Sequence, residues 1–168
     1  MNTLISGCVG YAIQEDYSGN IWAGTTDGLY CFNKNTEDLE RFTIAEGLPN
    51  NVICGLSEDF RHDIWISTYM GISRYDATKR CFVNYYSGDG LQGNEFTHGA
   101  FYKDKKGRIY FGGVNGITYF SPESIENVSK ETDVWITDFY VFNQPIHKNS
   151  LSGGKFIIRT SVQDANKT

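Results

Sequence analysis

The chain has 168 residues, a formal net charge of −5 and 40% apolar residues, which suits one ordinary globular domain. No window approaches the roughly 18–20 uninterrupted apolar residues of a membrane-spanning helix, and the first residues lack the features of a secretory signal. No stripe of Lys and Arg residues forms a surface that would bind nucleic acid. The 18 Gly, 3 Pro, 11 Tyr and 11 Phe favour short aromatic-rich strands joined by Gly turns.

Three similar segments follow one another along the chain. They begin at residues 15, 58 and 103 and read EDYSGNIWAGTTDGLYCFN, EDFRHDIWISTYMGISRYD and KDKKGRIYFGGVNGITYFS. An aromatic residue recurs at spacings of 43 and 45 residues, as Trp22, Trp65 and Tyr110. An aspartate and a glycine recur at the same offsets, as Asp16, Asp59, Asp104, Gly28, Gly71 and Gly116. So many coincidences indicate a true repeat.

Each unit predicts four strands in chain order. The first ends in the acidic pair, as in 52–59, and a tight turn of SGN, RHD or KGR follows it. The second strand lacks clean alternation, as expected where both faces are covered, and is predicted at 21–25, 64–68 and 109–113. The third alternates in the half-buried manner, at 28–33, 71–76 and 116–121. A fourth is predicted at 41–44 and 81–86, and no helical period occurs before about Pro122.

This pattern is typical of a β-propeller. Four short strands per unit of 43 to 45 residues, with an aromatic in the second strand, match a propeller blade, whereas a leucine-rich solenoid repeats every 20–29 residues or so. We therefore expect an all-β fold, a partial β-propeller of three four-stranded blades at residues 1–51, 52–94 and 95–127. Because propellers close with roughly 4 to 8 blades, other blades or other copies must complete a ring.

Several strings resemble catalytic motifs but lack the structure that the chemistry needs. GDGLQG at 88–93 fits a dinucleotide-binding pattern, yet a strand follows it instead of a helix, and SGGK at 152–155 is a poor helix opener. The two neighbouring carboxylates of each acidic pair could suggest an acid and a base. Adjacent residues of a strand point to opposite faces, however, so the two cannot act together on one substrate. The repeat aspartate is instead expected to cap its turn. No catalytic residue, metal or cofactor is expected, and no ligand role for the scattered His62, His98 and His147.

The four cysteines leave two interpretations open. Cys8, Cys31, Cys54 and Cys81 are even in number, which would suit two disulfides or a metal site. They form no CxxC pair and occupy unrelated places in the repeat. This favours small buried residues or free thiols.

The repeat also resembles a known family. The unit ED-x-x-G-N-I-W-A-G-T-x-x-G-L-x-x-F-N, followed by GLPNNV, is similar to the two-component regulator propeller repeat of hybrid sensors in Bacteroides-type gut bacteria. The second unit departs from it at Arg61-His62-Asp63, and the third replaces Trp by Tyr110. FSPESI resembles the last blade before an Ig-like Y_Y_Y sandwich. VWITDFYVFNQPI at 134–146 resembles the connector and first strand of that sandwich, so 128–168 is predicted as its truncated start.

The resemblance implies a function. The parent would be a membrane-anchored, homodimeric sensor whose periplasmic propellers bind a glycan fragment and control a cytoplasmic histidine kinase. The residues of the family motif build the scaffold, so the resemblance identifies no ligand-contacting residue in this chain. In propellers, the loops at one face usually carry the ligand-binding residues. The candidate ligand-binding residues are therefore those of the loops between blades, Asn50, Asn51, Asn94 and Glu95.

Two other functions remain open at this stage. One is the propeller of a polysaccharide lyase or glycosidase, because D-x-x-G-x-x-W is loosely like a sialidase Asp-box without its leading Ser. The other is a free-standing interaction protein whose copies assemble a ring. A three-blade arc leaves its two end faces uncovered, and 134–142 would add an unpaired strand. The chain is therefore expected to self-associate.

Overall fold

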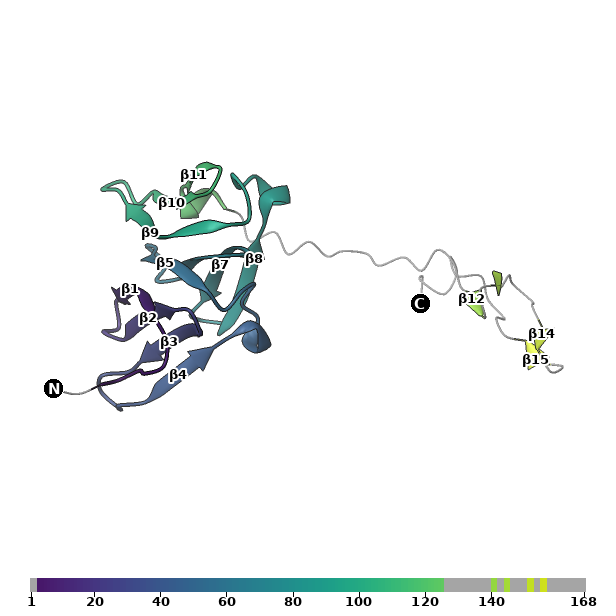
Figure 1. Ribbon diagram of the computed structural model, residues 1–168, viewed down its shortest axis with the longest axis horizontal. Coiled ribbons are helices and arrows are strands. Elements are labelled where there is room, and N and C mark those ends of the chain that lie inside the picture. The colour runs from purple at the N-terminus through teal and green to yellow at the C-terminus, as the bar shows by residue number, and fades with distance from the viewer. Residues whose placement is uncertain (1–2, 126–139, 142–143, 146–150, 153–154, 157–168) are drawn as a thin grey trace. The chain divides into compact units, whose positions relative to one another are not determined.

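The computed structural model describes residues 3–125, 140–141, 144–145, 151–152 and 155–156. Three antiparallel meander sheets follow one another in chain order, and we call them blades one, two and three (Figure 1). Blade one contains β1 (Gly10–Glu15), β2 (Ile21–Thr25), β3 (Gly28–Phe32) and β4 (Leu39–Phe42). Blade two contains β5 (Ile53–Glu58), β6 (Ile64–Thr68), β7 (Gly71–Asp76) and β8 (Cys81–Tyr85). Blade three contains β9 (Phe96–Lys103), β10 (Ile109–Gly113) and β11 (Gly116–Phe120).

The all-β, propeller-type fold is confirmed, and the three second strands have the predicted bounds. The fourth strand of blade one lies two residues earlier than predicted, because Thr43 caps a 3₁₀ turn, η1 (Ile44–Glu46). Blade three shows three strands among the described residues, where four were expected. After β11 the chain enters another 3₁₀ turn, η3 (Pro122–Ser124), in place of a hairpin.

The blades pack face to face through their sheets. Figure 1 shows β1, β5 and β9 side by side, with β4 and β8 farther from them. One apolar core lies between blades one and two, and contains Ala12, Trp22, Leu29, Phe42, Leu48, Ile53, Leu56, Ile64, Ile66 and Tyr75. A second lies between blades two and three, and contains Cys54, Trp65, Ile72, Phe96, Ile109 and Phe111.

Blade two is covered on both faces, and this corrects one expectation. Its third strand, β7, is buried at every residue, although its sequence predicted half-burial. The equivalent strands β3 and β11 are partly open, because only one face of their blades meets a neighbour. Burial at this position is decided by the number of neighbouring blades and not by the strand's own alternation.

Residues 127–168 form a separate unit. Its described parts are two short hairpins, in which β12 (Tyr140–Val141) pairs with β13 (Gln144–Pro145) and β14 (Leu151–Ser152) pairs with β15 (Lys155–Phe156). Tyr140–Val141 is therefore paired, whereas 134–142 was expected to be an unpaired strand. The rest of the predicted Ig-like start lies outside the described residues. Within the described ranges, no helix has the length and apolar character to cross a membrane.

Replacing Trp65 by Ala tests the blade assignment. The side chain is 1% exposed and packs on Phe120 of blade three at 4.6 Å between ring centroids. Its removal leaves a cavity between two blades, so we expect a loss of about 3–5 kcal/mol in unfolding free energy. Urea denaturation followed by tryptophan fluorescence and circular dichroism would measure it. Thr78→Ala, an exposed turn substitution, should change stability by less than about 0.5 kcal/mol. Equal midpoints for the two variants would contradict the assignment.

Candidate functional site

The repeat aspartate ties the turn after the first strand to the aromatic residue of the second. In blade two, Asp59 Oδ1 accepts the backbone N–H groups of Arg61 and Asp63 at 2.7 and 3.1 Å. Its Oδ2 accepts the indole N–H of Trp65 at 2.9 Å. Asp59 is buried, so these bonds satisfy a carboxylate that has lost its water.

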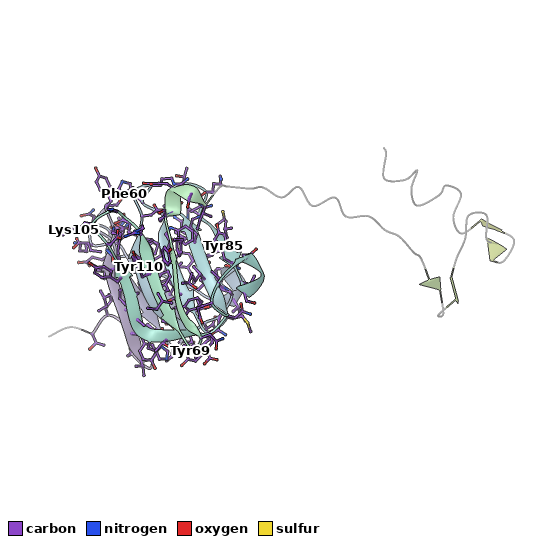
Figure 2. All side chains as sticks on the ribbon, turned by 90° about the horizontal axis from the view of Figure 1, so that it is seen from above. Phe60, Tyr69, Tyr85, Lys105 and Tyr110 are labelled. Carbon is purple, nitrogen blue, oxygen red and sulfur yellow. The ribbon has the colours of Figure 1, made fainter. Side chains whose placement is uncertain are left out.

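The same arrangement recurs in the other blades. In blade one, Asp16 Oδ1 accepts the Asn20 N–H and Oδ2 accepts the Trp22 indole N–H, both at 2.8 Å. In blade three, the phenol of Tyr110 donates to Asp104 Oδ2 at 3.2 Å. The three turns define one end of the sheets, which we call the aspartate end. Figure 2 shows Phe60 and Lys105 at this end and Tyr69 at the opposite one, the connector end.

The second and third strands meet in a tight turn at the connector end. Gly28, Gly71 and Gly116 close these turns, with φ of +116°, +100° and +128°, a region that favours glycine. A Cβ on Gly71 would lie 2.4 Å from the carbonyl oxygen of Tyr85. In blades one and two the repeat glycine therefore admits both the left-handed backbone and the close approach of the fourth strand, whereas at Gly116 only the left-handed backbone requires it.

The structure places the four predicted loop residues at the connector end. The side-chain oxygens of Asn51 and Asn94 accept the N–H groups that open the 3₁₀ turns, from Ile44 at 2.9 Å and Ser87 at 2.7 Å. Asn50 Oδ1 accepts the Val52 N–H at 2.8 Å, while Glu95 is exposed. Three of the four side chains thus hold the inter-blade loops in shape.

Sequence reasoning missed an aromatic cluster at this end. His98 of β9 stacks on Tyr11 of β1, with ring centroids 3.6 Å apart, and its Nε2 lies 2.6 Å from the hydroxyl of Tyr69. The three residues come from three different blades. Their separation in the sequence left no local pattern that could have found them.

A cleft of about 430 Å³ opens between blades one and two at the aspartate end. The predicted loop residues lie at the other end and do not line it. Its walls come from the aspartate turns and from the turns between third and fourth strands. The lining residues are Asp16, Ser18, Asn20, Trp22, Cys31, Asn33, Thr36, Asp38, Glu40, Glu58, His62, Tyr75, Ala77 and Arg80.

Carboxylates outnumber cations in this cleft, and two of them add to the effect of burial on the pKa of Cys31. Burial, together with the nearby carboxylates of Asp16 and Glu40, raises the pKa of its thiol to about 11. On the facing wall Arg80 holds both carboxylate oxygens of Glu40 at 2.8 Å. The cleft therefore offers many acceptors and a few donors, which suits a ligand rich in hydroxyl groups.

The rim of the cleft connects the two blades. His62 occupies the turn position where the other blades have glycine, with φ of +66°. Its ring stacks on Tyr17 of blade one at 4.1 Å between centroids, and its Nδ1 lies 3.1 Å from Glu58 Oε1. Glu58 Oε1 also accepts the Tyr17 N–H at 2.8 Å. A ligand in the cleft would therefore touch groups that hold the blade junction.

Comparisons with known proteins agree with this architecture. Residues 3–27 match the family model described as two component regulator propeller. The extracellular domain of the hybrid two component system BT3049 from B. thetaiotaomicron is 38% identical, with a TM-score of 0.66 over 68% of this chain and 16% of that chain. The repeats are those of the two-component regulator propeller.

Two further relatives support the placement of these regulator propeller repeats. The extracellular domain of BT4673 from the same organism is 25% identical, with a TM-score of 0.57, over 70% of this chain and 17% of that chain. Histidine kinase P4 of Formosa agariphila is 30% identical over 120 residues, which is 71% of this chain and 9% of that protein. The chain thus spans a small part of the length of each relative.

Asp59→Asn tests the role of the repeat carboxylate. The amide can still accept the turn N–H bonds, but it then turns an NH₂ group towards the indole N–H of Trp65. That buried donor loses its acceptor, and we expect a loss of about 1–3 kcal/mol in unfolding free energy, measured by chemical denaturation. Asp38→Asn, at an exposed aspartate, should change stability by less than about 0.5 kcal/mol. Unchanged stability of Asp59→Asn would mean that the Asp59–Trp65 bond contributes nothing.

The four free thiols should differ in reactivity. Burial raises the pKa of Cys54 to about 12 and contributes most to the raised pKa of Cys31. At pH 8 both are almost entirely in the unreactive thiol form, whereas Cys81 is exposed. A thiol reagent such as DTNB should therefore label Cys81 rapidly and Cys54 only after unfolding, and Cys81→Ser should remove the fast phase. Rapid labelling of Cys54 in the folded chain would contradict the described packing.

Proposed function

We propose that this chain is a ligand-recognising propeller segment of a two-component sensor histidine kinase, on the periplasmic side of a membrane. Its likeness to the extracellular domains of two hybrid two component systems supports this assignment. In the parent, further blades and a sandwich domain would adjoin the segment, and the parent would act as a homodimer. The segment itself recognises the ligand and carries no catalysis.

The ligand that the geometry favours is an oligosaccharide, bound in the cleft between blades one and two. The single observation behind this is the composition of the cleft, which carboxylates, amides and hydroxyls line together with Trp22 and Tyr75. Sugar hydroxyls donate to carboxylates and accept from Asn and Arg. Tyr17, 77% exposed beside His62, offers an aromatic face at the rim.

The position of the cleft supports a role in signal relay. Its two walls belong to different blades, and the Tyr17–His62 stack and the Tyr17–Glu58 hydrogen bond join these blades at the rim. A ligand that bridges the walls favours one arrangement of the junction over others. The bound arrangement would then shift the conformational equilibrium of the domains that connect the propeller to the kinase.

Binding of an oligosaccharide panel to the whole chain, measured by calorimetry, tests the proposal. Asp38→Ala and Ser18→Ala alter cleft side chains, and each should weaken binding by roughly 10-fold, the cost of losing a hydrogen bond to a charged or polar group. Asn50→Ala and Glu95→Ala, at the connector end, are the matched controls and should bind as well as the parent chain.

Each of the other outcomes would correct one part of the proposal. Loss of binding only in the Asn50 and Glu95 variants would move the site to the inter-blade loops. No binding by any oligosaccharide would overturn the ligand class. Cleaved products after incubation would favour the lyase or glycosidase alternative.

A further inference from the structure

The two junctions between blades pack their aromatic residues in the same way. At the first junction, Trp22 of blade one packs on Tyr75 of blade two, with 5.2 Å between ring centroids. At the second, Trp65 of blade two packs on Phe120 of blade three, with 4.6 Å between centroids. The two pairs occupy the same positions of the repeat. The residues around them can therefore be compared position by position.

One row of side chains next to these tryptophans differs between the junctions. Residues that lie directly opposite each other on neighbouring strands share a face of the sheet, so a row runs across the second, third and fourth strands. The row is Trp22, Cys31 and Glu40 in blade one, and Trp65, Arg74 and Val83 in blade two. Where blade two has a cation beside its tryptophan, blade one has a short thiol and, next to it, a carboxylate.

Arg74 places a buried cation beside the tryptophan of the second junction. It is 3% exposed, and its Cζ lies 5.9 Å from the centroid of the Trp65 ring. Its Nη1 lies 3.6 Å from Asp63 Oδ2. A guanidinium over an indole and near a carboxylate is stabilised both by the ring and by the opposite charge. This position of the repeat therefore accommodates a positive charge when carboxylates lie nearby.

At the first junction the corresponding position belongs to the cleft. Cys31 is half-buried and lines the cleft together with Trp22 and Glu40, the other two residues of its row. The side chain of cysteine is several atoms shorter than that of arginine. The cleft thus extends to the place that the Arg74 side chain fills at the second junction.

The electrostatic potential at this place favours a cation. Burial raises the pKa of the Cys31 thiol, and the carboxylates of Asp16 and Glu40 raise it further because they disfavour a second negative charge. Arg80 lines the same cleft, but both oxygens of Glu40 already accept its hydrogen bonds at 2.8 Å. Asp38, also in the lining, is exposed and adds another carboxylate. An anionic ligand would therefore be repelled, whereas a cationic one would be attracted.

We infer that the cleft binds an oligosaccharide that carries a protonated amino group, and that the ammonium lies beside Cys31 and Trp22. There it supplies the positive charge that Arg74 supplies at the second junction. The hydroxyls of the sugar meet the amides and carboxylates of the walls. Sugars that carry carboxylate or sulfate groups are disfavoured by the same charges. This inference rests on the oligosaccharide site proposed above and specifies the class of sugar.

A matched pair of probes tests the charge. One is a β-1,4-linked glucosamine tetramer, in a buffer acidic enough to protonate its amines, and the other is the same tetramer with every amine acetylated. Calorimetry on the whole chain should show that the amine form binds at least about 10-fold more tightly at low salt. The difference should shrink as salt is added, because salt screens the attraction. A galacturonate tetramer should bind more weakly than either form.

Substitution of Cys31 tests the place of the ammonium. Cys31→Arg introduces the residue of blade two, so a tethered guanidinium should occupy this part of the cleft and weaken binding of the amine form by at least about 10-fold. Cys31→Ser, of similar size and neutral, is the matched control and should bind like the parent chain. Circular dichroism would establish that both variants are folded.

Asp38→Asn tests the charge of the cleft without adding bulk. The amide can still accept hydrogen bonds from hydroxyls, but it no longer attracts an ammonium. The difference in affinity between the two glucosamine probes should therefore narrow several-fold. Glu95→Gln removes a carboxylate at the connector end and should leave that difference unchanged.

The outcomes separate this inference from the site on which it rests. Equal affinity for the amine and acetylated forms, tighter binding of the galacturonate tetramer, or a folded Cys31→Arg chain that binds like the parent would each overturn the inference and leave the oligosaccharide site standing. No binding by any of the three tetramers, in a chain that also binds no other oligosaccharide, would overturn the site and the inference together.

Discussion

One carboxylate per blade, that of Asp16, Asp59 or Asp104, connects the local turn to the core between blades. One of its oxygens accepts turn N–H groups, and the other accepts the indole or phenol donor six residues later. A buried indole N–H needs an acceptor, and this bond supplies it while fixing how the ring is aimed. In blades one and two the ring so oriented is the main aromatic of a junction core. Turn, strand pairing and blade packing therefore depend on the same group.

The junctions also require that the blades approach closely. A Cβ on Gly24 would lie 2.5 Å from Ile53, and one on Gly55 would lie 2.8 Å from Phe101. At each place glycine lets a large side chain of the following blade fill the space. The cleft at the aspartate end lies beyond this tight packing, where the turns separate and polar groups replace apolar ones. Its walls belong to two sheets, so the cleft lies at the junction between blades one and two.

Blade three keeps the design with different residues. In blades one and two, Thr25 and Thr68 accept the N–H that closes the hairpin turn. Blade three has Gly113 instead, and the side chain of Gln92 enters the vacated space and accepts the Asn115 N–H at 2.8 Å. The hydrogen bond recurs in all three repeats, although in blade three its acceptor side chain comes from another segment. A missing motif residue in one repeat is thus no evidence of a missing turn.

Much of this molecule could be predicted from the sequence alone. The repeat spacing, the bounds of β2, β6 and β10 and the tight turns between strands all follow from local turn chemistry and strand pairing, which act over a few residues. The predicted site was less complete. Asn51 and Asn94 were predicted as ligand contacts; their side chains accept loop N–H groups, and their ligand role stays a prediction.

Tertiary structure alone decided the rest. The half-burial predicted for β7 was wrong because a face is buried only by its neighbour, and no strand encodes how many neighbours its blade has. The same reason explains why Ile13 and Leu56, alike in sequence context, differ in exposure. The cleft brings Asp16 together with Arg80, and the connector end brings Tyr11 together with His98, because successive sheets stack in register. Such contacts join residues a blade or more apart, beyond the reach of any local pattern.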